Sequence, residues 1–190
     1  PSVLTIRRYK RYGGSGAGIC WFEANAINKD VRANPRQMTL LEENKNTFID
    51  LIKWYKQEEK LVQDQIKKYT QLMAHPSKKI LQITHSGRYT LPEKGFKNPL
   101  RMYHYDPLDK AYGETREDGK VLSDEELDTL PEKFYESARL AKEVGFDGVD
   151  IKSCHRYLLS ESLSAFTRES SKYRGEKYEA RTRLIKKIIE

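Results

Sequence analysis

The stretch GFDGVDIKSCHRYLL, residues 145–159, combines an apolar run with an abrupt polar break. The run from Phe146 to Ile151 has the composition of a buried β-strand. The polar segment behind it delivers Lys152, His155 and Tyr157 within six residues, and apolar residues resume at Leu158. Such a sequence indicates a strand whose carboxyl end carries chemically active side chains.

Helical and strand-like segments alternate along the rest of the chain. Helices are predicted over residues 2–12 with Ser2 as N-cap, over 42–73 as one helix or two, after the capping box SDEE at 123–126 as far as Gly145, and from about Glu176. Strands are predicted over GICWFEANA, ending near Ala24, over 80–83 and over 146–151. Strict alternation predicts an α/β fold with a parallel sheet and crossover helices.

Two further segments complete the prediction. In the last helix, the apolar face is assigned to Tyr178, Ile185, Ile188 and Ile189. Residues 86–122 are rich in Gly, Pro, Tyr and charged residues and show no clear period. A loop of this length in a compact domain usually caps a site or carries a small hairpin.

The composition indicates one globular domain. The chain has 190 residues, of which 37% are hydrophobic, and a formal net charge of +7. The basic residues are spread through Glu-rich helical segments, so a nucleic-acid partner is not expected. No apolar run is long enough to cross a membrane. Two distant cysteines favour a reducing, cytoplasmic location over a disulfide or zinc site, and no metal is expected.

Polar residues follow each predicted strand. They are Glu23 with Ala24, Gln82 with His85, and Lys152 with His155 and Tyr157. Active sites of (β/α)₈ barrels lie at this end of the strands. The glycine-rich GGSGAG at 13–18 precedes a strand instead of following it, so it does not match a dinucleotide-binding fingerprint.

Four segments of the chain resemble the old yellow enzyme family of flavin oxidoreductases. QITHSGR at 82–88 resembles its Q-x-x-H-x-G-R element, and GFDGVDIKSCHRYLL resembles G-F-D-G-V-E-I-H-x-x-H-G-Y-L-L. GAGICWFEANAINKDVRANPRQ resembles the family's second-strand region, and AFTRESSKYRGEKYEARTR its N-x-R-x-x-x-Y-G-G-S-x-E-N-R-x-R stretch. The segments come in the family's order and cover nearly the whole chain. The branch that they resemble most includes 2,4-dienoyl-CoA reductase and enoate reductases.

The resemblance implies the second to fourth strand–helix units of a (β/α)₈ barrel that binds FMN. Such enzymes take electrons from NAD(P)H and reduce activated C=C bonds of small α,β-unsaturated substrates. A hydride comes from flavin N5 and a proton comes from a tyrosine. Some relatives carry an iron–sulfur cluster, which would belong only to a region after these residues. The sequence does not indicate the oligomeric state.

The resemblance also assigns roles to individual residues. Tyr157 matches the proton donor, because a phenol stays protonated at neutral pH. His155 and Lys152 match the positions that stabilise the developing enolate oxygen, and Lys152 also lies beside the cofactor. Gln82 matches the glutamine that binds the flavin pyrimidine edge. Ala24 matches a small residue whose backbone lies against the flavin ring.

Alternative interpretations are simpler. In these interpretations the Gln82 side chain only fixes a loop, Tyr157 packs in the core, and Cys154 is a small buried residue. His85 is favoured as a satisfied structural histidine. The side chains of Arg88 and Arg156 are as compatible with solvation as with function. A non-catalytic (β/α) binding module is the second functional interpretation, and a basic nucleic-acid-binding domain is ranked last.

The sequence departs from the family's pattern in two places and in length. Arg156 stands in place of a glycine before Tyr157, and YRGEKYEAR at 173–181 loses a glycine, a serine and an asparagine of the family's stretch. A complete (β/α)₈ barrel takes about 250 residues. We therefore expect these residues to be a fragment of a longer enzyme, inactive in isolation, with an uncovered apolar interior.

Overall fold

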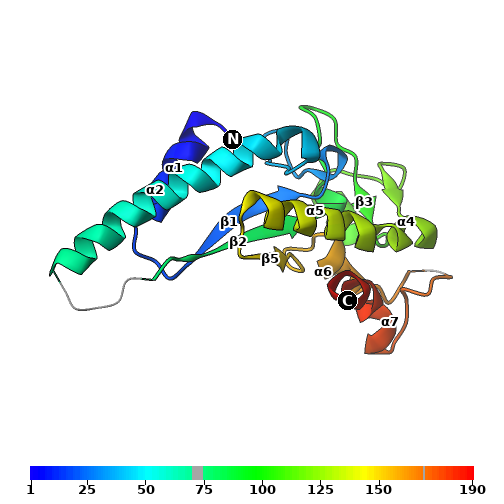
Figure 1. Ribbon diagram of the computed structural model, residues 1–190. Coiled ribbons are helices and arrows are strands. Elements are labelled where there is room, and N and C mark those ends of the chain that lie inside the picture. The colour runs from blue at the N-terminus through cyan, green and yellow to red at the C-terminus, as the bar shows by residue number, and fades with distance from the viewer. Residues whose placement is uncertain (70–74, 169) are drawn as a thin grey trace. The chain divides into compact units, whose positions relative to one another are not determined.

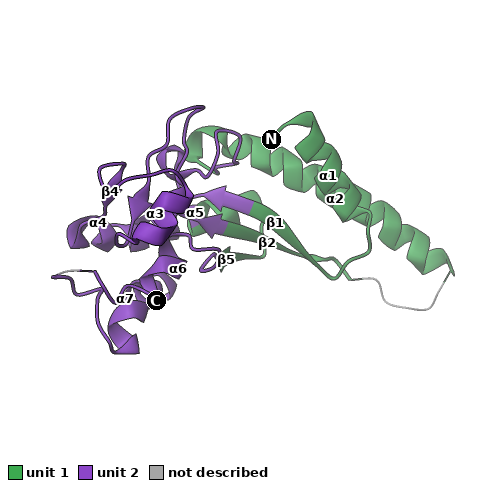
Figure 2. Cartoon of the chain, turned by 180° about the vertical axis from the view of Figure 1, so that it is seen from behind, with its two compact units in different colours: residues 1–23, 40–82, 138–150 green, residues 24–39, 83–137, 151–190 purple. Residues whose placement is uncertain are grey.

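The computed structural model describes residues 1–69, 75–168 and 170–190 (Figure 1). The chain divides into two compact units, coloured separately in Figure 2. Unit 1 comprises residues 1–23, 40–82 and 138–150, and unit 2 comprises residues 24–39, 83–137 and 151–190. Each unit is therefore assembled from three segments that are distant in sequence.

The central sheet has three strands in the order β1 (Ile19–Ala26), β2 (Lys78–Thr84), β5 (Gly148–Ile151). At one end of the β1–β2 pair, the Lys78 amide donates to the Gly18 carbonyl at 2.8 Å, and at the other end Ile27 donates to Thr84 at 3.0 Å. Like ends pair with like ends, so the predicted parallel arrangement is confirmed (Figure 1). The three predicted strands exist, with β1 running two residues past Ala24.

Unit 1 is built around helices α1 (Val3–Gly13) and α2 (Lys45–Tyr69), which lie side by side (Figure 1). The predicted Ser2 cap is confirmed, because its hydroxyl accepts a hydrogen bond from the Thr5 amide. A 3₁₀ turn, Glu42–Asn44, precedes α2, which is one continuous helix. Its predicted end near Met73 lies outside the described residues.

An aromatic cluster forms the core of unit 1. The rings of Tyr9 and Phe22 stack with centroids 4.0 Å apart, and Phe146 meets Phe22 edge-on at 4.9 Å. β1 places Cys20 and Phe22 on this buried side. Its alternate residues Ile19 and Trp21 are 53% and 54% exposed, as expected for a strand whose successive side chains point to opposite faces.

Buried polar contacts attach the start of β2 to α2. The hydroxyl groups of Tyr55 and Ser77 lie 2.7 Å apart. The Glu59 carboxylate accepts hydrogen bonds from the Ser77 amide at 2.6 Å and from the Ser77 hydroxyl at 2.5 Å. These residues are buried, so the contacts satisfy groups that are costly to leave unpaired.

The helix predicted after SDEE is two helices, α4 (Asp124–Asp128) and α5 (Leu130–Val144). The capping box is confirmed by hydrogen bonds between Ser123 and Glu126 in both directions. The break follows from Pro131, which lacks an amide hydrogen and whose ring clashes with a helical carbonyl four residues earlier. Gly145, with φ +102°, ends α5 as predicted.

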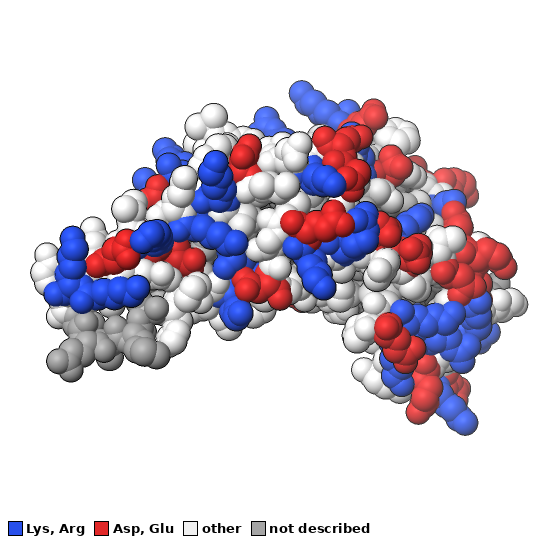
Figure 3. All heavy atoms as spheres, in the orientation of Figure 1, with Lys and Arg blue, Asp and Glu red and all other residues white. Residues whose placement is uncertain are grey.

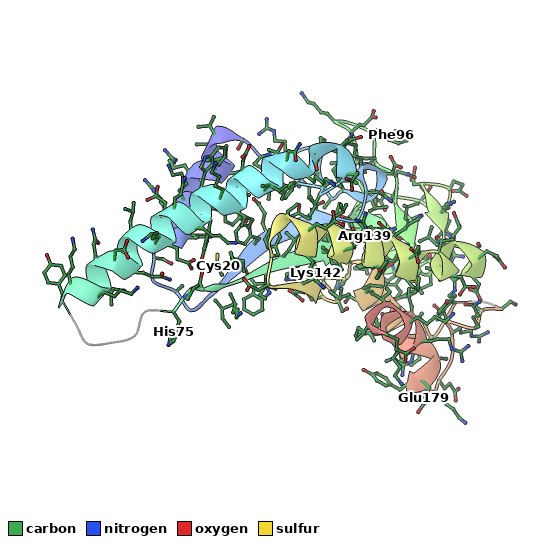
Figure 4. All side chains as sticks on the ribbon, in the orientation of Figure 1. Cys20, His75, Phe96, Arg139, Lys142 and Glu179 are labelled. Atoms are coloured by element: carbon green, nitrogen blue, oxygen red, sulfur yellow. The ribbon has the colours of Figure 1, made fainter. Side chains whose placement is uncertain are left out.

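Residues 86–122 contain regular elements that sequence periodicity did not indicate. They are a 3₁₀ turn (Gly87–Tyr89), β3 (Leu100–Arg101), α3 (Asp106–Ala111) and β4 (Lys120–Val121). β3 and β4 pair in parallel with α3 between them. The antiparallel pairing in this segment that the structure describes is the tight turn that joins Glu93 to Phe96. Phe96, labelled in Figure 4, is 56% exposed in this segment.

Two helices follow the central sheet in the chain. The short helix α6 (Leu158–Ser162) was not predicted. The last helix, α7 (Tyr178–Ile189), was predicted, but its apolar face was assigned wrongly. Its buried residues are Thr182 and Leu184, whereas Tyr178 and Ile189 are 60% and 69% exposed. The regular spacing of the isoleucines therefore did not identify the side that packs.

Charged residues of both signs lie on the face that Figure 3 presents. Figure 3 shows Lys and Arg side chains interspersed with Asp and Glu. Pairs one helical turn apart include Lys60 with Asp64 at 2.7 Å and Arg139 with Glu143, the former on α2 and the latter on α5 (Figure 4). No helix in the described part of the chain is both long and apolar enough to cross a membrane.

The contact between α1 and α2 depends on the absence of a side chain at Gly13. A Cβ atom there would lie 2.3 Å from the Tyr55 carbonyl oxygen. We expect Gly13→Ala to lower the free energy of unfolding by about 1–3 kcal/mol, because the backbones must separate. Thermal and urea unfolding would measure this.

The neighbouring Gly14 provides a matched control. Its nearest atom, the Arg11 carbonyl oxygen, would lie 3.7 Å from an added Cβ. Gly14→Ala should change the free energy of unfolding by less than about 0.5 kcal/mol. Equal effects of the two substitutions would show that the helices do not depend on close approach at Gly13.

Candidate active site

The segment after β5 forms a tight turn in unit 2. The Tyr157 amide donates to the Cys154 carbonyl at 3.2 Å, and the two residues between them, His155 and Arg156, have φ values of +58° and +56°. Left-handed backbone is uncommon for residues with side chains and costs about 1–3 kcal/mol each. The surrounding structure must therefore impose this turn.

Contacts on both sides of the turn fix it. Before it, the Lys152 amide donates to the Ile83 carbonyl at 3.0 Å. After it, the Leu158 amide donates to the His85 carbonyl at 3.2 Å. A Cβ on Gly87 would lie 2.6 Å from the Leu158 nitrogen, so this close approach requires glycine. Both hydrogen bonds therefore attach the turn to the carboxyl end of β2 and to the residue that follows it.

The turn brings two of the predicted catalytic residues into contact. The Lys152 ammonium nitrogen lies 4.4 Å from the centroid of the Tyr157 ring. Tyr157 is half-buried, and burial, followed by the Cys154 charge, raises the pKa of its phenol. The phenol therefore stays protonated at neutral pH and is able to donate a proton. This is the state that the predicted acid requires.

Tyr89 adjoins Tyr157, Tyr112 in turn adjoins Tyr89, and the sequence prediction missed both. The ring of Tyr89 lies 5.6 Å from that of Tyr157, and Tyr112 lies 5.0 Å from Tyr89 with a 3.2 Å hydrogen bond between their hydroxyls. Both come from the segment 86–122. The only available signal was the richness of that segment in tyrosine, which does not show which rings meet.

His155 and Cys154 lie on the exposed part of the turn. The Cys154 sulfur is 3.6 Å from Nδ1 of His155. The prediction that Cys154 is buried is wrong, because the left-handed turn lifts residues 154–156 to the surface. Cys20, on β1, is the buried cysteine (Figure 4), and both are free thiols.

Ala24 and Gln82 lie near the carboxyl ends of β1 and β2. In unit 2, the half-buried Ala24 accepts a hydrogen bond on its carbonyl from the Gln37 side chain at 3.0 Å. In unit 1, Nε2 of Gln82 donates to Asp150 at 2.7 Å. Glu23, also predicted among the polar residues, pairs with Arg8 at 3.1 Å.

These side chains are chemically suited to a flavin. The Gln82 amide has two hydrogens, so one remains after the bond to Asp150, together with an acceptor oxygen. The side chain of Ala24 is small, and Lys152 carries a positive charge. The simpler interpretation was that the Gln82 side chain fixes a loop. Its observed hydrogen bond instead joins two strands, β2 and β5.

His85 has the structural role that was favoured for it. It is 3% exposed, and its Nδ1 accepts a hydrogen bond from the Gly87 amide at 3.1 Å. Burial first, and then the positive charge of Lys133, lower the pKa of His85 to about 3. The imidazole is therefore neutral. Its hydrogen bond to the Gly87 amide fixes the segment after β2, whose His85 carbonyl accepts the bond from Leu158.

Arg88 is buried, so the interpretation of a solvated side chain is wrong. It is 2% exposed and pairs with Glu161 through Nε and with Asp109 through Nη1 at 2.7 Å. Arg101 extends the cluster by pairing with Asp109 at 3.2 Å and with Glu114 at 2.8 Å. These pairs link α3 and α6 to the segment after β2.

The neutral state of His85 predicts a pH dependence. Its folded-state pKa of about 3 lies below the unfolded value of about 6.5, so its contribution to stability is complete above pH 6.5 and is lost as the pH falls toward 3. His85→Asn keeps an acceptor for Gly87 but does not titrate. Between pH 6 and 4, the native protein should lose about 1.4 kcal/mol per pH unit more than this variant.

Urea unfolding at several pH values would measure both slopes. The comparison cancels the carboxylates that titrate over the same range in both proteins. Equal slopes for the native protein and His85→Asn would contradict a neutral, buried imidazole.

The comparison with known sequences places the chain among flavin oxidoreductases. The profile of the NADH:flavin oxidoreductase / NADH oxidase family matches residues 53–190. An NADPH dehydrogenase of Clostridium acetobutylicum is 26% identical over 92% of this chain and 45% of its own length. An NADH oxidase of Thermoanaerobacter brockii is 31% identical over 61% of this chain and 17% of its own length.

Solved structures show the same fold. Old yellow enzyme from Pichia sp. AKU4542 matches all of this chain and 47% of its own, with a TM-score of 0.76 and 18% identity. Morphinone reductase matches with a TM-score of 0.75 and 17% identity over 49% of its own chain. The predicted fold class, part of a (β/α)₈ barrel, is confirmed.

The chain spans about half the length of these structures and less than half of the curated relatives. The profile of the family covers well over half of this chain. The chain belongs to the NADH:flavin oxidoreductase / NADH oxidase family.

Proposed function

We propose that this chain is part of an FMN-dependent oxidoreductase that uses NAD(P)H to reduce activated C=C bonds of small α,β-unsaturated substrates. Membership of the family supports flavin-dependent oxidoreduction. The observation that carries the finer proposal is the protonated, half-buried Tyr157 beneath the Lys152 ammonium. A branch like that of 2,4-dienoyl-CoA and enoate reductases and a cytoplasmic location belong to the same proposal.

The cofactor is proposed to be held by Gln82, Ala24 and Lys152. When bound, FMN supplies the two-electron chemistry that no side chain of the protein provides. The Gln82 amide pairs with the pyrimidine edge through its remaining donor and acceptor. Ala24 offers a small side chain beside the ring, and segment 86–122 is proposed to cap the site.

Tyr157 is proposed to protonate the α-carbon of the substrate. Its proton is retained at neutral pH because burial raises the pKa. When the proton leaves, negative charge remains on the phenolate. The Lys152 ammonium lies over the face of the same ring, 4.4 Å from its centroid.

Lys152 and His155 are proposed to stabilise the enolate oxygen. Charge develops on the substrate carbonyl only as the double bond is reduced, so fixed donors there act most strongly in the transition state. The exposed position of His155 on the turn makes its ring accessible to a ligand. Membership of the flavin oxidoreductase family favours the enzyme over a non-catalytic module. Flavin absorbance of the protein purified from its full reading frame distinguishes the two.

The role of Tyr157 predicts a selective defect. In the complete FMN-loaded enzyme to which this chain is proposed to belong, Tyr157→Phe should slow reduction of an enone by about a hundredfold to ten-thousandfold, the usual contribution of a general acid. Reduction of the flavin by NAD(P)H should be nearly unchanged, because it needs no acid from this residue. Stopped-flow absorbance measures the two half-reactions separately.

Tyr135→Phe is the matched control, because this tyrosine is 60% exposed on α5. It should leave both half-reactions unchanged. If Tyr157→Phe left the enone half-reaction at the native rate, Tyr157 would be a packing residue.

His155 predicts a different pattern. His155→Ala should raise KM and also lower kcat for the enone, because the imidazole contacts the carbonyl in the ground state and in the transition state. Steady-state kinetics with a fixed saturating concentration of NAD(P)H would measure both constants. A fall in kcat with an unchanged KM would place His155 in the transition state only, contrary to this assignment.

A further inference from the structure

A cavity of about 360 Å³ lies beside the turn that carries Tyr157. It belongs to unit 2, and its walls combine three aromatic rings and a leucine with one arginine, one glutamate and three hydroxyl side chains. The residues that matter here are Tyr103, Tyr105, Leu108, Arg156, Glu161 and Phe166. Its volume is that of a small-molecule site.

Arg156 provides the positive charge of this cavity. Its side chain is exposed, and it makes no ion pair with any residue in the part of the chain that the structure describes. Glu161 also lines the cavity, but both of its carboxylate oxygens are engaged, one by Arg88 and the other by the Met102 amide at 3.1 Å. Among the residues that line the cavity, Arg156 therefore supplies the charge that is available to a ligand.

The aromatic walls are open to an apolar ligand. Tyr105 and Phe166 are 48% and 49% exposed. The polar end of Tyr103 is already bound, because its hydroxyl lies 2.8 Å from the Ser164 hydroxyl. The Arg181 guanidinium lies 3.9 Å from the Phe166 ring centroid and adds positive potential on that side. An apolar body with an anionic group would complement such walls.

The backbone at Arg156 gives an independent reason to look for function here. Its φ of +56° is one that glycine adopts freely and that a residue with a Cβ adopts at a cost. Strained residues of this kind persist where the surrounding structure imposes them, and they gather at ligand sites. Here the strained residue directly precedes the proposed acid, Tyr157.

We propose that Arg156 binds a carboxylate of the substrate and that the substrate is an enone whose aromatic or alicyclic body carries that carboxylate away from the reacting double bond. The inference rests on the proposed function, because it identifies the ligand with the substrate that Tyr157 protonates. The planar guanidinium is suited to a carboxylate, with which it forms two parallel hydrogen bonds. The aromatic residues of the cavity bind the apolar body.

Two measurements test the proposal on the FMN-loaded protein. The first is calorimetric binding of 4-(3-oxobutyl)benzoate, a saturated keto acid that requires no turnover, and of the corresponding benzamide, which has nearly the same shape without the charge. The second is KM for 4-(3-oxobut-1-enyl)benzoate, the matching enone acid, and for its amide. We expect the native protein to prefer each acid over its amide by about tenfold to a hundredfold.

Arg156→Gln should abolish this preference and leave the affinity for the amides within about twofold. Arg156→Lys, which keeps the charge, should retain part of it. Arg156→Gly removes the charge and suits the left-handed turn, so it serves if Arg156→Gln does not fold. Arg174→Gln, at an exposed arginine that does not line the cavity, should leave the preference unchanged.

The outcomes separate the two proposals. Equal affinity of the native protein for acid and amide, or equal losses of both in Arg156→Gln, would overturn the carboxylate site even if enones are reduced. Arg156-dependent binding of the keto acid without reduction of any enone would support the anion site and overturn the proposed function.

Discussion

The buried ion pairs of Arg88 are the interaction on which the architecture of unit 2 depends. A guanidinium that is 2% exposed joins Asp109 of α3 to Glu161 of α6, and burial, opposed by Arg88, raises the pKa of Glu161 to about 7. Removing one partner of a buried pair typically costs about 3–5 kcal/mol, because the other charge is left without compensation. The segment after β2 and the helix after Tyr157 are therefore fixed together.

The left-handed turn at residues 154–157 depends on this frame. Two consecutive residues with positive φ do not form such a turn by local preference, since side chains disfavour it. The bond from Leu158 to the His85 carbonyl and the close approach at Gly87 hold the far end of the turn. The result is the contact between Lys152 and Tyr157, which gives the phenol a nearby charge while burial keeps it protonated.

Arg156 connects the turn to selectivity. In the family's pattern this position is a glycine, which relieves the strain that the arginine carries. The arginine instead provides an unpaired cation to a cavity walled by aromatic rings. The replacement of this glycine by Arg156 thus strains the backbone and at the same time adds a positive charge that is able to bind an anionic ligand. The tyrosine, lysine and histidine around it keep the types that the proposed chemistry needs.

The sequence by itself determined the elements whose signals are local. Neighbours within a few positions of the chain determine the three strands, the Ser2 cap and the SDEE capping box. The sequence also shows directly which side chains follow the third strand, at residues 152–157. Tertiary structure decided the rest. The exposure of Cys154, the buried face of α7, the parallel pairing of β3 with β4, and the meeting of Tyr89 with Tyr157 all depend on groups distant in sequence. Periodicity reports which residues share a face, but only packing selects the face that is buried, because burial is a contact between segments and not a property of one.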